Sequence, residues 1–261
     1  MLSNEFQEII DRRRSNRKFD PLVEVPDEVI KRSLERAILS PNSSNMQLWE
    51  FYWIKNKEER EKYTALCLGQ SAAKTAKQIV VFVTRKDLWP QRAKWNYDRL
   101  KNAIKGEPNK LEKRGLDYYG KLMPLAYRSD IFGVFAFIRR CMSFFMGLRK
   151  PFIRFGGKAD QRITVHKSCA LAAQTFMLSI AAEGFECCPM EGFDQVRVKK
   201  HLNLPSGAEI NMIISVGKGT NDGVWGPRFR IPYEEVVFER KLIIIHYFAG
   251  VIIMLRYSIT P

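Results

Sequence analysis

The 261-residue sequence predicts a fold that contains both strands and helices, and three segments carry this prediction. Residues 79–83 and 210–216 are continuous apolar runs, which are typical of strands buried on both faces. Residues 165–184 are rich in alanine and apolar nearly all round, as expected of a helix at the centre of a fold. No repeat or linker separates these segments, so we expect one domain.

Composition limits the class of protein. Apolar residues make up 46% of the chain and charged residues 27%, which are values of globular proteins. The 43 basic residues against 28 acidic ones give a net charge of +15, which suits nucleic acid, an anionic membrane or an anionic cofactor as a partner. Five cysteines without CxxC spacing, three histidines and no N-terminal signal sequence predict a cytoplasmic protein without a zinc site.

The chain begins with an expected helix at residues 4–14, where Phe6 and Ile9 recur at helical spacing and mark a buried side. It leads into a basic run at residues 12–20. The guanidinium group of arginine can donate two hydrogen bonds to phosphate oxygens, so the run can form a phosphate-binding site. A solvated basic helix end explains it as well, and both interpretations stay open at this point.

A second helix is expected at residues 28–39, ended by Pro41. The loop that follows, within residues 40–51, reads SPNSSNMQLWEF. Its amide and hydroxyl side chains offer donors and acceptors without charge, which suits a flat polar heterocycle better than a metal or a phosphate. An ordinary polar loop before the strand at residues 51–55 is the alternative.

The remaining elements follow from the same periodicities. We expect helices at residues 58–68, 92–104, 130–148 and 196–202, the buried strands and central helix named above, and a short apolar segment at residues 185–190. Residues 217–223, GKGTNDG, lack the glycine spacing of a dinucleotide loop and are predicted to form a turn.

The region of residues 85–160 is basic and aromatic. Its helix at residues 130–148 is interrupted by Arg139 and Arg140 and is too short to span a membrane. Such a helix can lie on an anionic membrane, or it can form a lid or dimer surface. We favour the lid or dimer surface and expect no specific nucleic acid as partner.

Four motifs occur in one order along the chain: RRRSNRKFD at residues 12–20, SPNSSNMQLWEF at 40–51, PMEGFD at 189–194 and PRFRIP at 227–232. Together they resemble the nitroreductase family of flavoproteins, over about residues 6–239. The resemblance implies a nitroreductase-like fold of the α+β class, with a central, mainly antiparallel sheet flanked by helices. It also implies a homodimer with FMN at the subunit interface and a C-terminal strand exchanged between subunits, here residues 234–238.

The resemblance further implies the residues of the FMN site, which fall into four groups. Arg13, Arg14, Ser15, Arg17, Arg228 and Arg230 would bind the phosphate and ribityl chain; Pro41, Asn42, Ser43, Asn45 and Gln47 would come from the other subunit; Gln70 would meet the pyrimidine edge; Pro189, Met190, Glu191 and Gly192 would back the ring and approach its N5 atom. One departure is Leu48, where the family usually has proline before tryptophan.

The implied function is hydride transfer from NAD(P)H, as co-substrate, to a small-molecule acceptor such as a nitro compound or quinone, by a ping-pong mechanism. We expect no metal and no obligate catalytic side chain, because the flavin carries the chemistry. Alternatives are a basic anion-binding or membrane-surface protein, or the same fold with another reaction such as reductive dehalogenation.

The resemblance also sets the expected domain organisation. Residues 1–240 form one FMN-binding domain with 85–160 as a helical insertion or lid, and residues 241–261 form an apolar tail. Peripheral membrane contact would run through 130–150 or 241–261.

Overall fold

The computed structural model describes residues 2–130, 132–154 and 157–239. The chain divides into two compact units, Met1–Trp225 and Gly226–Pro261. The apolar tail predicted at residues 241–261 lies outside the described residues, and the predicted domain boundary at residue 240 stays a prediction.

A four-stranded sheet forms the centre of the first unit. Its strands lie in the order β1-β2-β4-β3, and each neighbouring pair is antiparallel. The strands are β1 (Trp49–Ile54), β2 (Gln78–Arg85), β3 (Glu186–Met190) and β4 (Ala208–Gly217). The apolar runs predicted to be buried strands are thus the two central strands, β2 and β4, which pair along their length with Val80 opposite Ile214.

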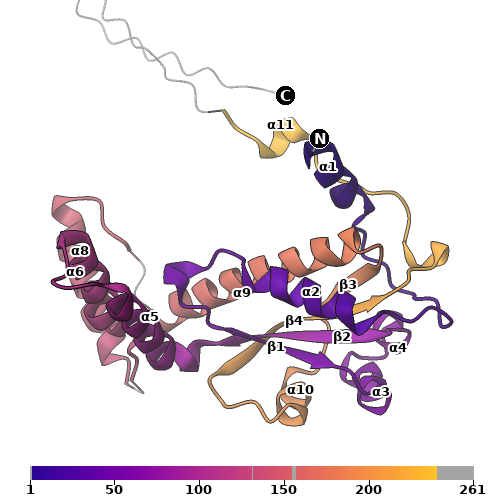
Figure 1. The fold of residues 1–261 in the computed structure, drawn as a ribbon, viewed down its shortest axis with the longest axis horizontal. Coiled ribbons are helices and arrows are strands. Elements are labelled where there is room, and N and C mark those ends of the chain that lie inside the picture. The colour runs from indigo at the N-terminus through magenta and orange to yellow at the C-terminus, as the bar shows by residue number, and fades with distance from the viewer. Residues whose placement is uncertain (1, 131, 155–156, 240–261) are drawn as a thin grey trace, which may run out of the picture. The chain divides into compact units, whose positions relative to one another are not determined.

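One face of the sheet is covered by α2 (Asp27–Ile38) and α9 (Lys158–Ala182), which lie side by side (Figure 1). The fully buried side chains of Ile30, Phe82 and Phe176 belong to the core of this face. The helix predicted at residues 165–184 is therefore central as expected, and it begins seven residues earlier, at Lys158. Its first turn is stabilised there because Asp160 accepts a hydrogen bond from the backbone of Gly157.

The opposite face is covered by α3 (Lys57–Leu66), α4 (Ser71–Lys74) and α10 (Gln195–His201) (Figure 1). Tyr63, Val81 and Ile213 are fully buried in its core. Apolar side chains alternate to both faces of β2, which explains why its sequence is continuously apolar.

An ionic contact joins α2 to the end of α9. Arg32 donates to Glu183 Oε2 at 2.6 Å and Arg36 donates to Oε1 at 2.7 Å. These hydrogen bonds, that of Arg32 first, hold the pKa of Glu183 at about 2, well below its ordinary value of 4.5. The carboxylate side chain is only 14% exposed, so water screens it little, although both arginines are about half exposed.

We expect Glu183→Gln to lower the free energy of unfolding at pH 7 by about 2 kcal/mol, after allowing for solvent screening of the arginines. Because the folded-state pKa is depressed, the stabilisation is present above pH 4.5 and is lost as the pH falls towards 2. Urea unfolding at pH 7 and at pH 3 measures the difference. Glu61→Gln removes an exposed partner of Lys57 and serves as the control, with an expected loss below about 0.5 kcal/mol. A difference between Glu183→Gln and the parent that does not shrink at low pH would contradict this account.

Residues 86–149 form a helical region beyond β2. It contains a 3-10 turn (Lys86–Leu88), α5 (Trp89–Ala103), α6 (Lys110–Asp117), a π-helical turn (Tyr118–Leu122), α7 (Met123–Tyr127) and α8 (Val134–Arg149). The sequence predicted α5 and α8 but missed α6 and α7. A signal for α6 was present, because Asn109 and Glu112 form a capping box at its start.

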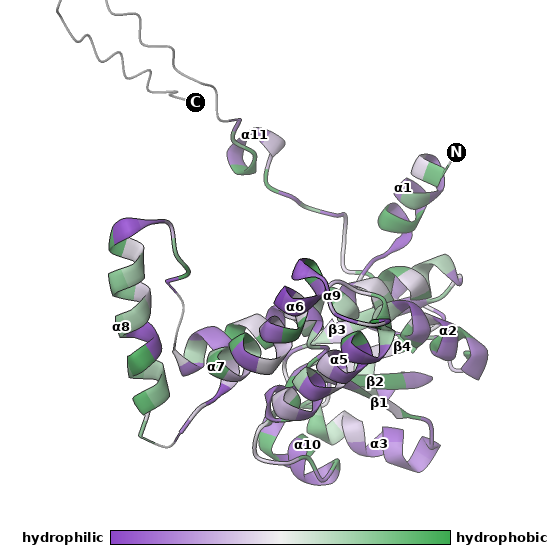
Figure 2. Cartoon of the chain, turned by 60° about the vertical axis from the view of Figure 1, so that its left-hand side comes forward, coloured by the Kyte–Doolittle hydropathy of each residue, from purple (hydrophilic) through white to green (hydrophobic). Residues whose placement is uncertain are grey.

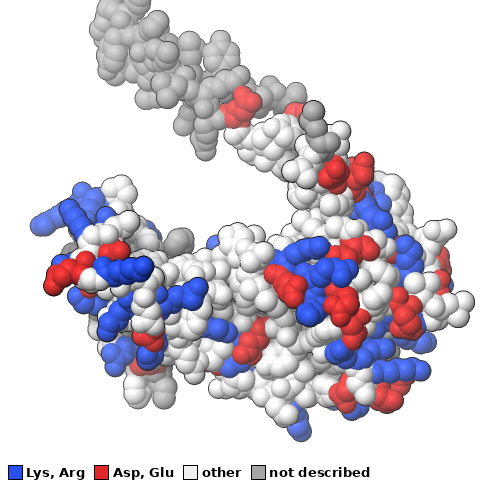
Figure 3. Space-filling model, in the orientation of Figure 1, with Lys and Arg blue, Asp and Glu red and all other residues white. Residues whose placement is uncertain are grey.

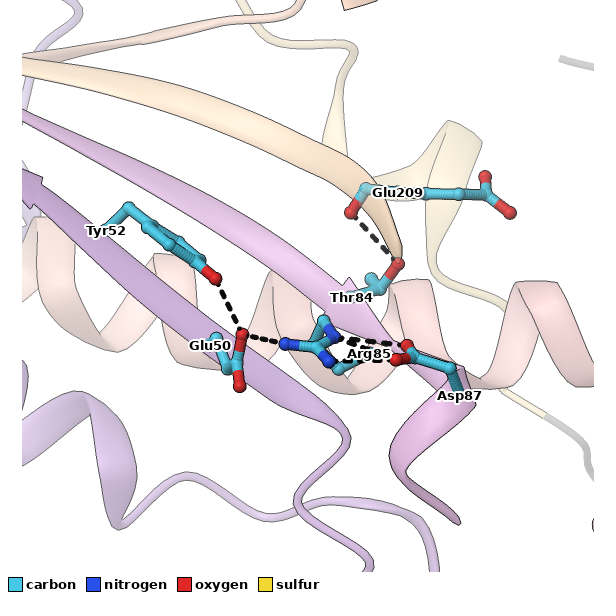
Figure 4. A network of polar contacts seen from close by, with 6 residues as sticks. All are labelled: Glu50, Tyr52, Thr84, Arg85, Asp87 and Glu209. Carbon is cyan, nitrogen blue, oxygen red and sulfur yellow. Dashed lines mark hydrogen bonds and ion pairs between the residues drawn. The ribbon is translucent and has the colours of Figure 1, made fainter. Parts of the chain in front are cut away.

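A polar network fixes the point where β2 passes into this region (Figure 4). The Arg85 side chain is 12% exposed and contacts Asp87 at 2.8 Å as well as Glu50 on β1. Tyr52 donates to the same Glu50 carboxylate at 2.9 Å. Hydrogen bonds to Asp87 and Glu50 raise the pKa of Arg85 above its ordinary value, so the network stays charged and ties the sheet edge to the helices.

Two terminal elements differ from the predictions. α1 (Leu2–Arg12) ends two residues early and buries no residue; Phe6, expected on a buried side, is 55% exposed. The segment predicted as a strand exchanged between subunits, residues 234–238, begins within the short helix α11 (Tyr233–Val236) in the described chain, and its exchange with a partner stays a prediction. Pro232 precedes this helix and two glutamates occupy its first turn, which favours a helix start over an unpaired strand.

Candidate functional site

The basic segment of residues 13–18 runs beside β3 rather than continuing the first helix. Ser15 forms a parallel bridge with Cys187, and the backbone N–H of Asn16 donates to the Cys187 carbonyl at 3.2 Å. The backbone N–H of Arg17 donates to the Gly223 carbonyl at 2.8 Å. The predicted phosphate-binding residues Arg13, Arg14, Ser15 and Arg17 are therefore placed along the edge of the sheet.

Asn16 anchors this segment and was missed by the sequence analysis. Its side chain is 3% exposed, donates to the Thr220 carbonyl at 3.0 Å and accepts from the backbone N–H of Lys18 at 3.1 Å. The loop it enters contains glycines for a steric reason: a Cβ atom would lie 2.2 Å from Asn16 Nδ2 at Gly219 and 1.9 Å from Asn16 Oδ1 at Gly223. Gly219 and Gly223 of the predicted turn thus leave space for the Asn16 side chain, which holds the basic segment in place.

Charges around the segment have identifiable partners. Arg12 pairs with Glu186 at 3.3 Å, Lys18 pairs with Asp222, and the Arg17 guanidinium lies 4.3 Å from the centre of the Trp225 ring. Burial raises the pKa of Cys187 to about 12, and the positive charge of Arg13 opposes that rise. The Arg13 charge is therefore within electrostatic range of β3. A protonated, buried thiol at this position fits core packing, not redox chemistry.

The C-terminal end of β3 brings the next predicted residues together. Gln70 donates through Nε2 to the Gly192 carbonyl at 2.5 Å and to the Cys67 carbonyl at 3.0 Å. Met190 is 2% exposed, whereas Pro189 is half-buried and the two residues after Met190 are exposed. A Cβ atom at Gly192 would lie 3.3 Å from Gln70 Nε2, so glycine keeps this backbone accessible. The first motif therefore lies beside β3, and residues 189–192 form the end of this strand and its continuation. Gln70 contacts that continuation at Gly192.

The polar loop between α2 and β1 is held in a strained conformation, with a 3-10 turn at Ser43–Asn45. Ser44, Asn45 and Gln47 have positive φ angles of 55°, 50° and 47°, which non-glycine residues rarely adopt. Asn42 Oδ1 supports the turn by accepting from the backbone N–H of Gln47 at 2.8 Å. Strain of this kind is concentrated at ligand-binding sites, so the loop remains the best candidate for the second half of the site.

Three residues that the sequence analysis did not single out position this loop. Ser168 on α9 accepts from the backbone N–H of Ser43 at 3.2 Å, and Asn96 on α5 accepts from the Asn45 side chain at 3.2 Å. The Tyr118 hydroxyl contacts the Ser44 hydroxyl at 2.6 Å. The helical region of residues 86–149 thus supports the loop directly.

Within one chain the two halves of the predicted site lie far apart. The polar loop contacts α9 at Ser168, whereas Arg12, next to the basic segment, donates to the Gly184 carbonyl just beyond the C-terminal end of α9. At about 1.5 Å per residue, the helix from Ser168 to Ala182 separates them by about 20 Å. Ser43 and the basic segment of one chain are therefore separated along α9, while Ser40, at the start of the loop, donates to Thr175 between them at 2.7 Å.

A cavity of about 420 Å³ opens beside the polar loop, between α7, α8 and α9. Leu125, Tyr127 and Met142 contribute to its apolar walls, and Ser43 belongs to its rim. The polar lining includes Gln161, which is 8% exposed and donates to the Ala126 carbonyl at 2.5 Å. Its Oε1 atom accepts no hydrogen bond within the described residues. The cavity suits a mainly apolar ligand that carries a donor group.

The second predicted phosphate pair lies in the unit that starts at Gly226. Arg228 is half-buried and Arg230 is exposed, and Arg230 donates to the Phe229 carbonyl at 2.5 Å. The joint action of these arginines with Arg13 stays a prediction.

The described residues fit a flavin mononucleotide in two respects. Cations on a fixed backbone segment suit the phosphate, and the exposed backbone at Gly192 leaves room for a flat ring. The first feature lies beside β3 and the second directly follows its C-terminal end.

Comparisons with known proteins show the family to which the chain belongs. A sequence model described as "Nitroreductase family" matches residues 10–218. The protein named "Putative NAD(P)H nitroreductase MhqN" of Bacillus subtilis is 25% identical over 233 residues, which cover 89% of this chain and 98% of the relative.

Solved structures show the same fold. A nitroreductase-like protein of Streptococcus mutans has a TM-score of 0.68 at 21% identity, covering 92% of this chain and 100% of that one. A structure from Exiguobacterium sibiricum, described as a "putative nitroreductase in complex with FMN", has a TM-score of 0.63 at 20% identity, covering 90% and 97% of the two chains. At these identities the two structures establish the fold.

Proposed function

The chain belongs to the nitroreductase family, and on this premise we propose that it is an FMN-dependent oxidoreductase that uses NAD(P)H to reduce a small electrophilic acceptor. The observation that carries the proposal is the gathering of the basic segment, Gln70 and residues 189–192 around β3. Curated relatives of the chain bear names such as NAD(P)H nitroreductase and NADH dehydrogenase, which supports the reaction class.

The chain's own residues bind and orient the cofactor. Arg13, Arg14 and Arg17 neutralise the phosphate, and the backbone fixed by Asn16 sets their spacing. Gln70 holds the carbonyl of Gly192, so that the backbone next to the ring keeps one conformation. When bound, FMN supplies the redox chemistry, and no side-chain acid or base is required.

A homodimer completes the site in this proposal. The polar loop of one subunit would reach the β3 edge of the other, and it would contribute Pro41, Asn42, Ser43, Asn45 and Gln47. The separation of about 20 Å along α9 between the contacts of Ser43 and Arg12 supports this.

The acceptor is proposed to be a nitro compound, a quinone or a similar electrophile, and to alternate with NAD(P)H at one open face of the ring. The cavity between α7, α8 and α9 supports a mainly apolar acceptor, because it adjoins the polar loop at Ser43. We place the enzyme in the cytoplasm, which the five free cysteines support.

The full-length protein tests this proposal through its absorbance spectrum. We expect purified protein, or protein incubated with FMN and then desalted, to show flavin absorbance in the visible range. Anaerobic addition of NADH or NADPH should bleach it, and a quinone or nitroaromatic compound should restore it. Protein that stays colourless after incubation with FMN would overturn the proposal.

A further inference from the structure

Helix α8 presents its apolar side to the surface. Val134, Phe137, Ile138, Phe144, Phe145 and Leu148 are between 41% and 68% exposed, and we call this set the α8 face. Figure 2 shows α8 hydrophobic along most of its length, with hydrophilic residues confined to its middle and one end. Six large apolar side chains on one helix exceed the scattered exposure that is normal for a protein surface.

The buried side of the same helix is polar. Arg139 is 9% exposed and donates to the backbone carbonyls of Arg128 at 2.7 Å and Leu125 at 3.2 Å. Ser143 is 5% exposed and donates to the Ile153 carbonyl. A helix on a protein surface normally turns its apolar side inward, so α8 has the reverse orientation. These polar contacts hold the α8 face outward.

The stretch of chain that contains α8 carries charge of one sign. No aspartate or glutamate occurs in residues 131–159, whereas this stretch contains six arginines and lysines, among them the exposed Arg140, Arg149 and Lys150. Figure 3 shows many Lys and Arg side chains over the helical region to which α8 belongs, with some Asp and Glu side chains among them. An apolar face with a basic surround has the composition of helices that lie in the interface of anionic membranes.

We propose that the α8 face docks the protein on the surface of an anionic phospholipid bilayer. A second copy of the chain is a poorer occupant, because two such faces would bring like charges together. The contact is interfacial: none of the helices in the described parts of the chain has the length and apolar content needed to cross a membrane. The apolar side chains would enter the boundary between headgroups and acyl chains, with the cations at the lipid phosphates.

This proposal does not depend on the flavin reaction, and its test needs no turnover. Full-length protein is sedimented with vesicles of phosphatidylglycerol and phosphatidylcholine, and with vesicles of phosphatidylcholine alone. We expect binding to the anionic vesicles that weakens as salt is added. Phe144→Ser with Phe145→Ser should lower the partition coefficient by at least about tenfold, because both side chains lose their contact with acyl chains.

The charge component is tested with a matched pair of variants. Arg140→Gln with Arg149→Gln should lower partitioning by about 30-fold, at about 1 kcal/mol per cation. Lys31→Gln with Lys200→Gln makes the same change in net charge at exposed positions on α2 and α10 and should leave binding within about twofold. Circular dichroism confirms that each variant is folded.

Three outcomes would overturn the proposal. The parent protein could fail to bind anionic vesicles at low salt, or the Phe144 and Phe145 variant could bind as well as the parent, which would place any membrane contact outside α8. In the third outcome, the parent protein does not bind vesicles, and the Phe144 and Phe145 variant has half the mass of the parent in solution. The α8 face would then be an interface between copies of the chain.

Discussion

Alanine at both Arg13 and Arg14 is expected to weaken FMN binding by at least about 100-fold, while the protein remains folded. Each charge-assisted hydrogen bond to a phosphate contributes about 1.5–3 kcal/mol net, so the loss of two gives a factor of this size. Both residues lie on the segment that β3 fixes through Ser15 and Cys187. Titration of the apoprotein with FMN, followed by fluorescence quenching, measures the dissociation constant.

Lys110→Ala with Lys113→Ala is the matched control, because it removes two exposed cations from α6. An equal loss of affinity in this control would show that net charge, rather than a phosphate site, is responsible. A double-mutant cycle between Arg13→Ala and Arg228→Ala then asks whether both arginines act on the same phosphate. Strictly additive effects would separate Arg228 from the phosphate site.

Asn16→Ala is expected to lower the free energy of unfolding by about 2–4 kcal/mol and to reduce flavin affinity as well. The substitution removes two part-buried hydrogen bonds, to the Thr220 carbonyl and from the Lys18 N–H, at about 0.5–1.5 kcal/mol each. It also leaves a cavity where the buried amide packs against Gly219 and Gly223, which adds about 1 kcal/mol. The basic segment would lose its fixed spacing at the same time. Urea unfolding and FMN titration of the same preparation measure both effects.

Asn16→Asp separates the two contacts of this side chain. It keeps an acceptor for Lys18 N–H and loses the donor to Thr220, so its stability should fall between those of the parent and Asn16→Ala. Asn102→Ala, at an exposed position on α5, should change stability by less than about 0.5 kcal/mol. Parent-like unfolding of Asn16→Ala would refute the anchoring role.

The family and the central fold could be predicted from the sequence because their signals are local. Continuous apolar runs identified β2 and β4, and an alanine-rich apolar helix identified α9. The antiparallel character of the sheet was predicted only through the resemblance, and its strand order was not predicted, since strand order depends on contacts between distant segments. The helices α6 and α7 were missed because a π-helical turn joins them and disturbs the helical period of the apolar residues.

The residue types of the site were predictable from the sequence, but the residues that hold the site segments in place were not. Asn16 was hidden inside a basic motif, and only the close approach of Gly219 and Gly223 reveals its role. Asn96 and Ser168 support the polar loop from other helices, and single polar residues on helices give no sequence signal of such a contact. The exchanged strand at residues 234–238 was predicted only through the resemblance; the described chain has a short helix at Tyr233–Val236, and a strand there would need the sheet edge of a partner.

The separation along α9 between the contacts of Ser43 and Arg12 has a consequence for how flavin binding depends on dimer formation. If each flavin needs the polar loop of one subunit and the β3 edge of the other, the dimer contains two sites and neither subunit alone contains a complete one. Dissociation of a single pair would then empty both sites together, and retention of the flavin would rise with protomer concentration.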